Sequence, residues 1–188
     1  MDTNKWITQI DKTTELFKNE FEKLSDEELN WKASKNSWSI AQNIEHLIII
    51  NETYFPIIKA LKDGSYKISF LHKIGFLVNM MGNMILKAVQ PDRKKRIKTF
   101  NIWEPTKSKI SSDILERFIN HQLNLKTHIE NSSELLRKKT VISSPAIKKI
   151  VYKLETAFDI IVSHELRHFE QAKEILTLQK KNKKKPQR

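Results

Sequence analysis

The sequence predicts an all-α protein, a four-helix bundle with a long crossover between its second and third helices. Three observations lead to this fold class. The chain of 188 residues contains only 3 Gly and 5 Pro, so it is poor in the residues that make turns. Apolar residues recur at helical spacing in four long segments, and no stretch of any length alternates as a strand would. The length suits one domain with a core of its own.

The first two long helices are predicted over residues 3–24 and 40–61. The first rests on apolar residues at roughly helical spacing, among them Trp6, Ile10 and Phe17. Residues 24–36 are polar, and we expect a loop there. Ser39 followed by Gln42 has the spacing of a capping box, which would start the second helix.

The second helix contains a proline, and its end is marked by a turn signal. Pro56 either kinks this helix or breaks it in two, because proline removes a backbone donor and clashes with the preceding turn. Asp63 and Gly64 then form a dipeptide that favours a turn.

The crossover and the last two helices follow. Residues 66–90 are predicted to form a short, apolar, methionine-containing helix, and residues 91–109 a basic, irregular connection. The third long helix is expected from Ser111 or Ser112 to Lys138. Ser144 and Pro145 together have the pattern of an N-cap and a first helical position, so we expect a helix start there. The last long helix is predicted over residues 153–179.

Composition excludes several classes of protein. The chain has no cysteine, which excludes disulfides, thiolate metal ligands and a cysteine nucleophile, and agrees with a reducing cytoplasm. The N-terminus lacks the basic and apolar regions of a signal peptide. The most apolar stretch, residues 70–89, carries five polar side chains, so we expect no membrane span. We therefore expect a cytoplasmic protein.

The net charge is +12, and much of it lies in two basic runs, at residues 93–98 and 180–188. Such runs attract nucleic acid or anionic lipid. The favoured interpretation is a solvated loop and a disordered basic tail, residues 180–188, beyond a domain of residues 1–179. The tail has no aromatic side chain on which a base could stack, so a nucleic-acid partner is not favoured.

Three histidines have the spacing of a metal site. His164 and His168 are four residues apart, so on a helix they share one face and can bind one ion together. His46 lies far upstream and would have to come from another helix. Three ligands with a remaining open position are typical of a catalytic metal, and imidazole suits Zn, Ni, Fe or Cu. By itself an i,i+4 pair is a weak signal, because a single buried histidine is more often a hydrogen-bonded core residue.

Two motifs around these histidines strengthen the interpretation. WSIAQNIEHL resembles the start of the second helix in the DinB-like metal-binding superfamily, and HELRHFEQ resembles the H-x-x-x-H-x-x-Q pattern of its final helix. The resemblance extends over residues 1–179. It implies a DinB-like bundle whose metal ligands are His46, His164 and His168. The alternative is a degenerate member that has lost the metal.

Side chains next to these ligands have alternative roles. Gln42 and Gln171 each lie one turn from a ligand, so each either orients a ligand or substrate, or packs in the bundle. Asn43 is a weaker candidate for the same role. Glu45 and Glu165 directly precede a ligand, and we expect both to face solvent because adjacent helix positions point about 100° apart.

The remaining aromatic and imidazole side chains are predicted to be structural or ordinary. We expect Trp38 to anchor the start of the second helix rather than to line a pocket. The other histidines, His72, His121 and His128, are predicted to be ordinary polar residues.

The resemblance implies a metal-dependent enzyme acting on a small molecule, either a transferase that uses a low-molecular-weight thiol (bacillithiol, mycothiol or glutathione) or a hydrolase. We expect one divalent ion (Zn, Ni or Fe), and a thiol would have to be a cosubstrate because the chain has no cysteine. A non-catalytic, stress-related bundle that binds metal or ligand is the alternative, and a basic nucleic-acid-associated protein is less favoured. Scattered glycines and the lack of a nucleophile-elbow serine argue against nucleotide-dependent chemistry and serine hydrolysis.

The apolar segment of the crossover also suggests an association. Phe70, Phe76 and the methionines that follow either cover the bundle or join two subunits, since methionine-rich faces are often used at contacts. A homodimer is the favoured prediction.

Overall fold

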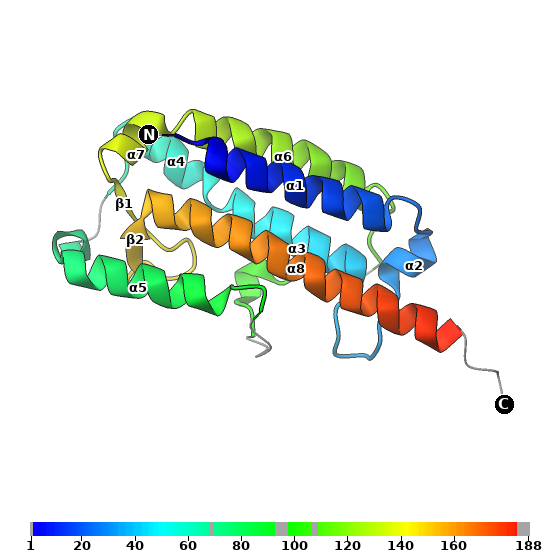
Figure 1. Cartoon of the computed structure of the whole chain (residues 1–188). Coiled ribbons are helices and arrows are strands. Elements are labelled where there is room, and N and C mark those ends of the chain that lie inside the picture. The colour runs from blue at the N-terminus through cyan, green and yellow to red at the C-terminus, as the bar shows by residue number, and fades with distance from the viewer. Residues whose placement is uncertain (1, 68–69, 93–97, 107–108, 184–188) are drawn as a thin grey trace.

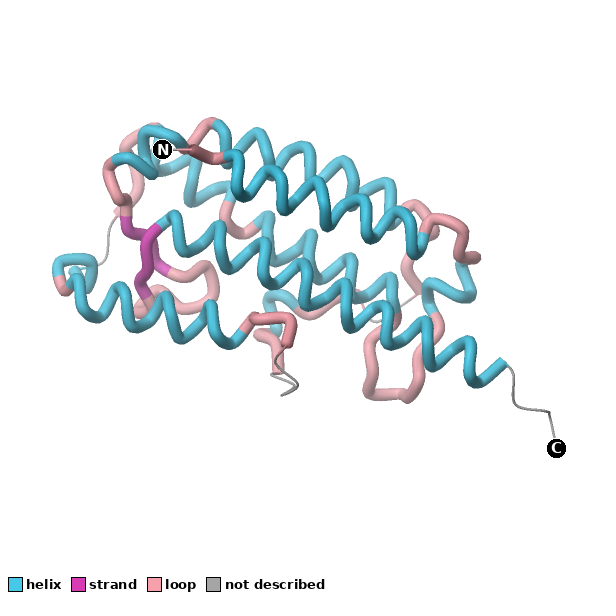
Figure 2. The backbone as a smooth tube through the Cα atoms, viewed as in Figure 1, coloured by secondary structure: helices cyan, strands magenta, loops and turns pink. Residues whose placement is uncertain are grey.

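Four long helices lie side by side and form the bundle (Figures 1 and 2). The computed structural model describes residues 2–67, 70–92, 98–106 and 109–183. In the bundle α1 and α8 run in one direction and α3 and α6 in the other (Figure 1). Around the bundle α1 packs on α6 and α8, and α3 packs on the same two helices. The predicted fold class is confirmed, and the bundle helices are α1 (Asn4–Phe21), α3 (Ile40–Glu52), α6 (Ile114–Glu130) and α8 (Leu154–Lys183).

Two clusters of fully buried side chains fill the bundle. Toward the start of α1, Trp6 packs edge-on against Phe158, with ring centroids 5.3 Å apart, and its indole N–H donates to Asp159 at 2.7 Å. Toward the end of α1, Phe17 contacts Phe118 at 4.7 Å between ring centroids. The triad of histidines lies on α3 and α8, two helices that pack directly against each other.

The second predicted helix is broken rather than kinked. α3 ends at Glu52, and α4 (Phe55–Lys62) begins three residues later with Pro56 in its first turn. Proline is tolerated there because that N–H has no partner within the helix. Gly64 has a positive φ of 76°, which confirms the turn predicted at this position.

The described residues of the long crossover from α4 to α6 form three helical elements: η1 (Phe70–Lys73), α5 (Gly75–Ala88) and η2 (Asn101–Trp103). α5 lies along the outside of the bundle, against the first half of α8 and the strand before it (Figure 1). A glycine permits this close approach, since a Cβ on Gly82 would stand 3.0 Å from Thr156 Cγ2 and 3.1 Å from Tyr152 Cβ.

Two helical boundaries differ from the prediction. Residues 24–36 are not all loop, because α2 (Asp26–Asn30) forms within them behind a capping box of Ser25 and Glu28. The third long helix is interrupted after Glu130, and α7 (Ser133–Arg137) is a separate short helix.

The helix start predicted at Ser144 and Pro145 is wrong. Two three-residue strands, β1 (Val141–Ser143) and β2 (Val151–Lys153), form an antiparallel hairpin there, with Ile142 opposite Tyr152. The Ser144 N–H donates to the Ile150 carbonyl at 2.7 Å, so this serine closes the hairpin rather than capping a helix. β-branched and aromatic residues favour strands, but runs this short give no clear alternation.

The C-terminal helix is longer than predicted. α8 continues through Lys183, whose ammonium lies 2.7 Å from Glu28, so residues 180–183 are helical rather than part of a tail. Residues 184–188 of the predicted tail, and 93–97 of the predicted basic connection, lie outside the described residues. Within the part of the chain that the structure describes, no helix has the length and apolarity to cross a membrane.

Candidate metal centre

The structure brings His46, His164 and His168 together in one cluster. α3 supplies the first imidazole and two successive turns of α8 supply the others. Each offers a nitrogen, and these nitrogens all lie within 4.8 Å of one another. The Nε2 atoms of His164 and His168 are 3.0 Å apart. Because metal–imidazole bonds are about 2.0–2.1 Å long, two nitrogens on one ion stand about 3 Å apart, so this spacing suits a shared ion.

Hydrogen bonds fix which nitrogen of two of these rings carries the proton. Nδ1 of His46 lies 2.7 Å from the Trp103 carbonyl, and Nδ1 of His168 lies 2.8 Å from Oδ1 of Asn43. Both partners only accept, so each Nδ1 must donate and each Nε2 keeps its lone pair. The amide of Asn43 donates to the Ser39 carbonyl at 2.9 Å, which holds its oxygen toward His168. This is how metal-binding imidazoles are commonly oriented.

Burial keeps the three imidazoles neutral. Desolvation lowers the pKa of His46, against an opposing effect of its hydrogen bond to Trp103. Desolvation, followed by the neighbouring imidazoles and Arg167, lowers the pKa values of His164 and His168 well below the usual range. Neutral imidazole is the form that binds metal, so the cluster is ready for an ion at neutral pH.

Trp38 forms one wall of the cluster. Its ring centroid lies 4.8 Å from that of His46 and 6.0 Å from that of His168, where the two planes are inclined by 24°. The expectation that Trp38 only anchors the start of a helix was therefore too narrow. All three histidines are buried at the cluster, although His164 taken as a whole residue is more exposed than His46 and His168.

Gln42 and Glu45 hold the backbone that orients His46. The Gln42 amide donates to the Thr106 carbonyl at 2.7 Å, and the Thr106 N–H donates to Glu45 Oε2 at 2.6 Å. Gln42 also completes the predicted capping box with Ser39. Glu45 is buried, so the prediction that it faces solvent is wrong. Both side chains therefore hold Thr106, three residues after Trp103, and so help to position the Trp103 carbonyl that accepts from His46.

The prediction that Glu165 faces solvent is also wrong. The Glu165 side chain is 0% exposed, and its two hydrogen-bond partners lie on α3 and α6 inside the bundle. Asn51 donates to its Oε1 at 2.8 Å and Gln122 to its Oε2 at 2.9 Å. Burial raises the pKa of Glu165 to about 7, despite the lowering effect of these two bonds.

The other candidates do not join the cluster. His121 is buried with its ring stacked on Phe55, 5.5 Å between centroids, and His128 stacks on the same ring at 4.1 Å. His121 is thus not an ordinary surface residue, and burial lowers its pKa to about 4. Gln171 is half-buried on α8, and in the described part of the chain no hydrogen bond joins it to the three histidines.

Comparison with known proteins gives one family match. The family model described as the DinB superfamily matches residues 9–172, and the chain belongs to that superfamily. No curated protein and no solved structure matches the chain.

Removing the Asn43 side chain tests whether it orients His168. Asn43→Ala is expected to weaken metal binding by about 10- to 100-fold, the usual effect of losing such a partner. The measurement is competition with a chelating dye. Asn30→Ala is the matched control, since Asn30 makes two hydrogen bonds to the Ile110 backbone. Equal affinities of the two variants would show that Asn43 has no part in the site.

Proposed function

We propose that this chain is an enzyme that binds one divalent metal ion (Zn, Ni or Fe) through His46, His164 and His168. It uses this ion to catalyse a reaction of a small-molecule substrate. The reaction is either transfer of a low-molecular-weight thiol or hydrolysis. One observation carries the proposal. Nδ1 of His46 and Nδ1 of His168 each donate a hydrogen bond, which leaves Nε2 of both rings free to bind an ion. Nε2 of His168 lies 3.0 Å from Nε2 of His164.

The ligand set supports catalytic rather than structural use of a metal. Three neutral imidazoles leave at least one coordination position for water or a thiol. They add no negative charge, so the positive charge of the ion is not offset. An ion held by these three imidazoles would lower the pKa of water or a thiol and so supply a nucleophile near neutral pH. The thiol is external because the chain has no cysteine.

The chain's own residues shape what reaches this position. Trp38 lies against His46 and His168 and covers one side of the cluster, which leaves the approach beside His164 as the proposed entry for substrate. The Asn43 amide and the Trp103 carbonyl hold two imidazoles in place and keep their protons on Nδ1. Gln171, one turn beyond His168, is proposed to contact substrate.

A second candidate is a bundle that binds metal or ligand without turnover. The burial of His46 and His168 favours it, because a deeply enclosed ion exchanges and reacts slowly. Turnover in a screen of thiol-transfer and hydrolysis substrates separates the two functions.

Metal removal tests the catalytic function. Chelation is expected to abolish turnover, and added divalent ion to restore it. If zinc-bound water is the nucleophile, the rate should rise with pH around about 7, where such water loses its proton. The measurement is initial rate against pH, with His128→Ala as a control that retains activity. Full activity in a variant with His46, His164 and His168 all replaced by alanine would refute the mechanism.

A further inference from the structure

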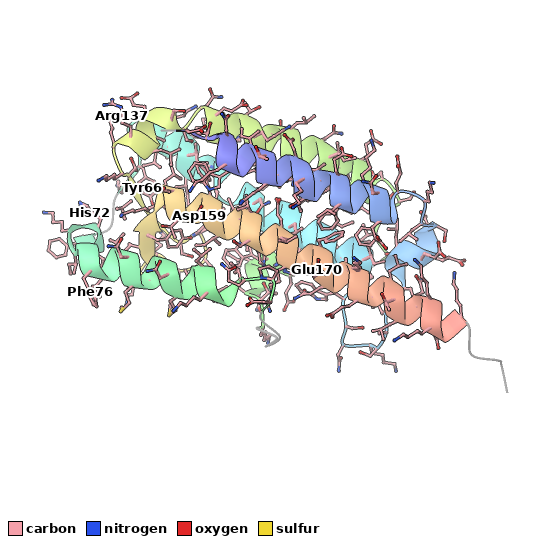
Figure 3. All side chains as sticks on the ribbon, viewed as in Figure 1. Tyr66, His72, Phe76, Arg137, Asp159 and Glu170 are labelled. Atoms are coloured by element: carbon pink, nitrogen blue, oxygen red, sulfur yellow. The ribbon has the colours of Figure 1, made fainter. Side chains whose placement is uncertain are left out.

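The outer face of α5 carries exposed apolar side chains on the outside of the bundle. Phe76, Met80 and Met84 are spaced by four residues and form one ridge, beside a second ridge of Asn79, Asn83 and Lys87. Together these six side chains line one shallow depression. Phe76 is 74% exposed and Met84 57% exposed. Figure 3 places Phe76 and His72 at the end of the molecule formed by α5 and η1.

This face is not part of the core. The opposite side of α5 already packs on the bundle, through the buried Val78 and through Gly82, which approaches Thr156 and Tyr152. A surface helix normally has one apolar face, and that face is used here. A second, exposed apolar face indicates a contact with another molecule or surface.

The segment of the sequence that contains this face is rich in cations. From Gly64 to Trp103 the sequence carries eight lysines and arginines, and Asp92 is its single acid. Seven of the nine large apolar side chains that are exposed in the described residues fall in the same stretch. Among the described basic residues Lys67, Lys73, Lys87 and Lys98 are exposed. The stretch therefore combines exposed apolar groups with an excess of cations.

We propose that the outer face of α5 docks on the surface of an anionic phospholipid bilayer, independently of the function proposed above. Phe76, Met80 and Met84 enter the boundary between headgroups and acyl chains, while Lys73 and Lys87 approach the lipid phosphates. Apolar groups on one ridge with lysines beside them are the features by which helices bind in the interface plane. The bilayer is contacted, not crossed.

A second copy of the chain fits this face less well. A two-fold dimer places the same patch on both sides of the interface, so the cations of one copy would meet the cations of the other. Like charges placed opposite each other disfavour association. The homodimer predicted from this segment is thus the competing occupant, and it gives a different experimental result.

Vesicle sedimentation of the full chain tests the proposal. The protein is expected to bind vesicles that mix phosphatidylcholine with phosphatidylglycerol, and not vesicles of phosphatidylcholine alone. Raising salt from about 0.1 M to about 1 M should release it, since the screening length falls from about 10 Å to about 3 Å. The double variant Phe76→Asp/Met80→Asp should lower the partition coefficient at least about tenfold. Lys73→Gln should lower it about fivefold.

The controls separate this face from general stickiness and from self-association. Leu123→Asp/Leu178→Asp changes two other exposed apolar side chains, on α6 and α8, and should leave vesicle binding unchanged. Lys12→Gln is the matched charge control on α1. No binding to anionic vesicles, or equal loss in both double variants, would overturn the proposal. So would light scattering that shows a dimer of the wild type and a monomer of Phe76→Asp/Met80→Asp.

Discussion

The His168→Ala variant is expected to bind almost no metal. The wild type should hold one divalent ion per chain. The variant keeps two imidazoles from different helices and loses the chelate across one turn of α8. Its metal affinity should therefore fall by more than about 100-fold, which exceeds the usual effect of removing a residue that only hydrogen-bonds to a ligand. The fold should persist, because the bundle is held by two clusters of apolar side chains that do not include the triad.

Elemental analysis after gel filtration measures this directly, with circular dichroism to confirm the helices. His128→Ala is the matched control, because this histidine stacks on Phe55 away from the triad and should retain full metal. His46→Ala keeps the chelate across α8 but should also lose metal, because it leaves only two of the three imidazoles. Stoichiometric metal in both ligand variants would rule out the proposed ligand set.

The second large effect concerns the stability of the fold. Between pH 4.5 and about 7, Glu165 of the folded protein keeps a proton that it has released in the unfolded chain. The contribution of Glu165 to the free energy of unfolding therefore falls as pH rises through this range, whereas the buried histidines, whose pKa values are lowered, contribute with the opposite sign. A pKa shift of this size corresponds to about 3 kcal/mol at pH 8, where the buried carboxylate is charged. The stabilising effect of the neutral acid is fully present only below the unfolded pKa.

Glu165→Gln removes this charge, so the change in free energy of unfolding from pH 4.5 to 8 should be about 3 kcal/mol more positive in the variant than in the wild type. Oε1 of Gln122 is buried without a partner in the described structure, so a rotated Gln122 can accept from the new amide. Urea unfolding of chelator-treated protein at both pH values measures the difference. The exposed Glu116→Gln should change stability by less than about 0.5 kcal/mol. Identical pH profiles for wild type and Glu165→Gln would disprove the assignment.

The bundle could be predicted because its signals are long. Each long helix repeats apolar residues over several turns, and the capping box of Ser39 and Gln42 gave the start of α3 to the residue. The short elements could not be predicted in the same way. The hairpin around Ser144 has three residues in each strand, and its pairing depends on contacts between strands that periodicity does not contain.

The triad could be predicted for a different reason, the match of two motifs to one family. What orients the triad was harder to foresee. Asn43 was ranked below Gln42, yet it is Asn43 that accepts from His168. The position of Asn43 four residues after Ser39 could have indicated this role. When the Asn43 amide donates to the Ser39 carbonyl, its oxygen is turned toward α8. The Trp103 carbonyl could not have been predicted, since any residue can offer a backbone oxygen and only the fold of the crossover places this one.

The central claim is that three imidazoles of this chain hold one metal ion, and X-ray absorption spectroscopy of the purified, metal-loaded protein tests it most directly. The spectrum should show three imidazole nitrogens at about 2.0–2.1 Å for zinc, with at least one oxygen ligand from solvent. Adding a small thiol should replace that solvent ligand by sulfur at about 2.3 Å if the protein activates thiols. A spectrum with fewer than three imidazoles, or one unchanged by His168→Ala, would contradict the account.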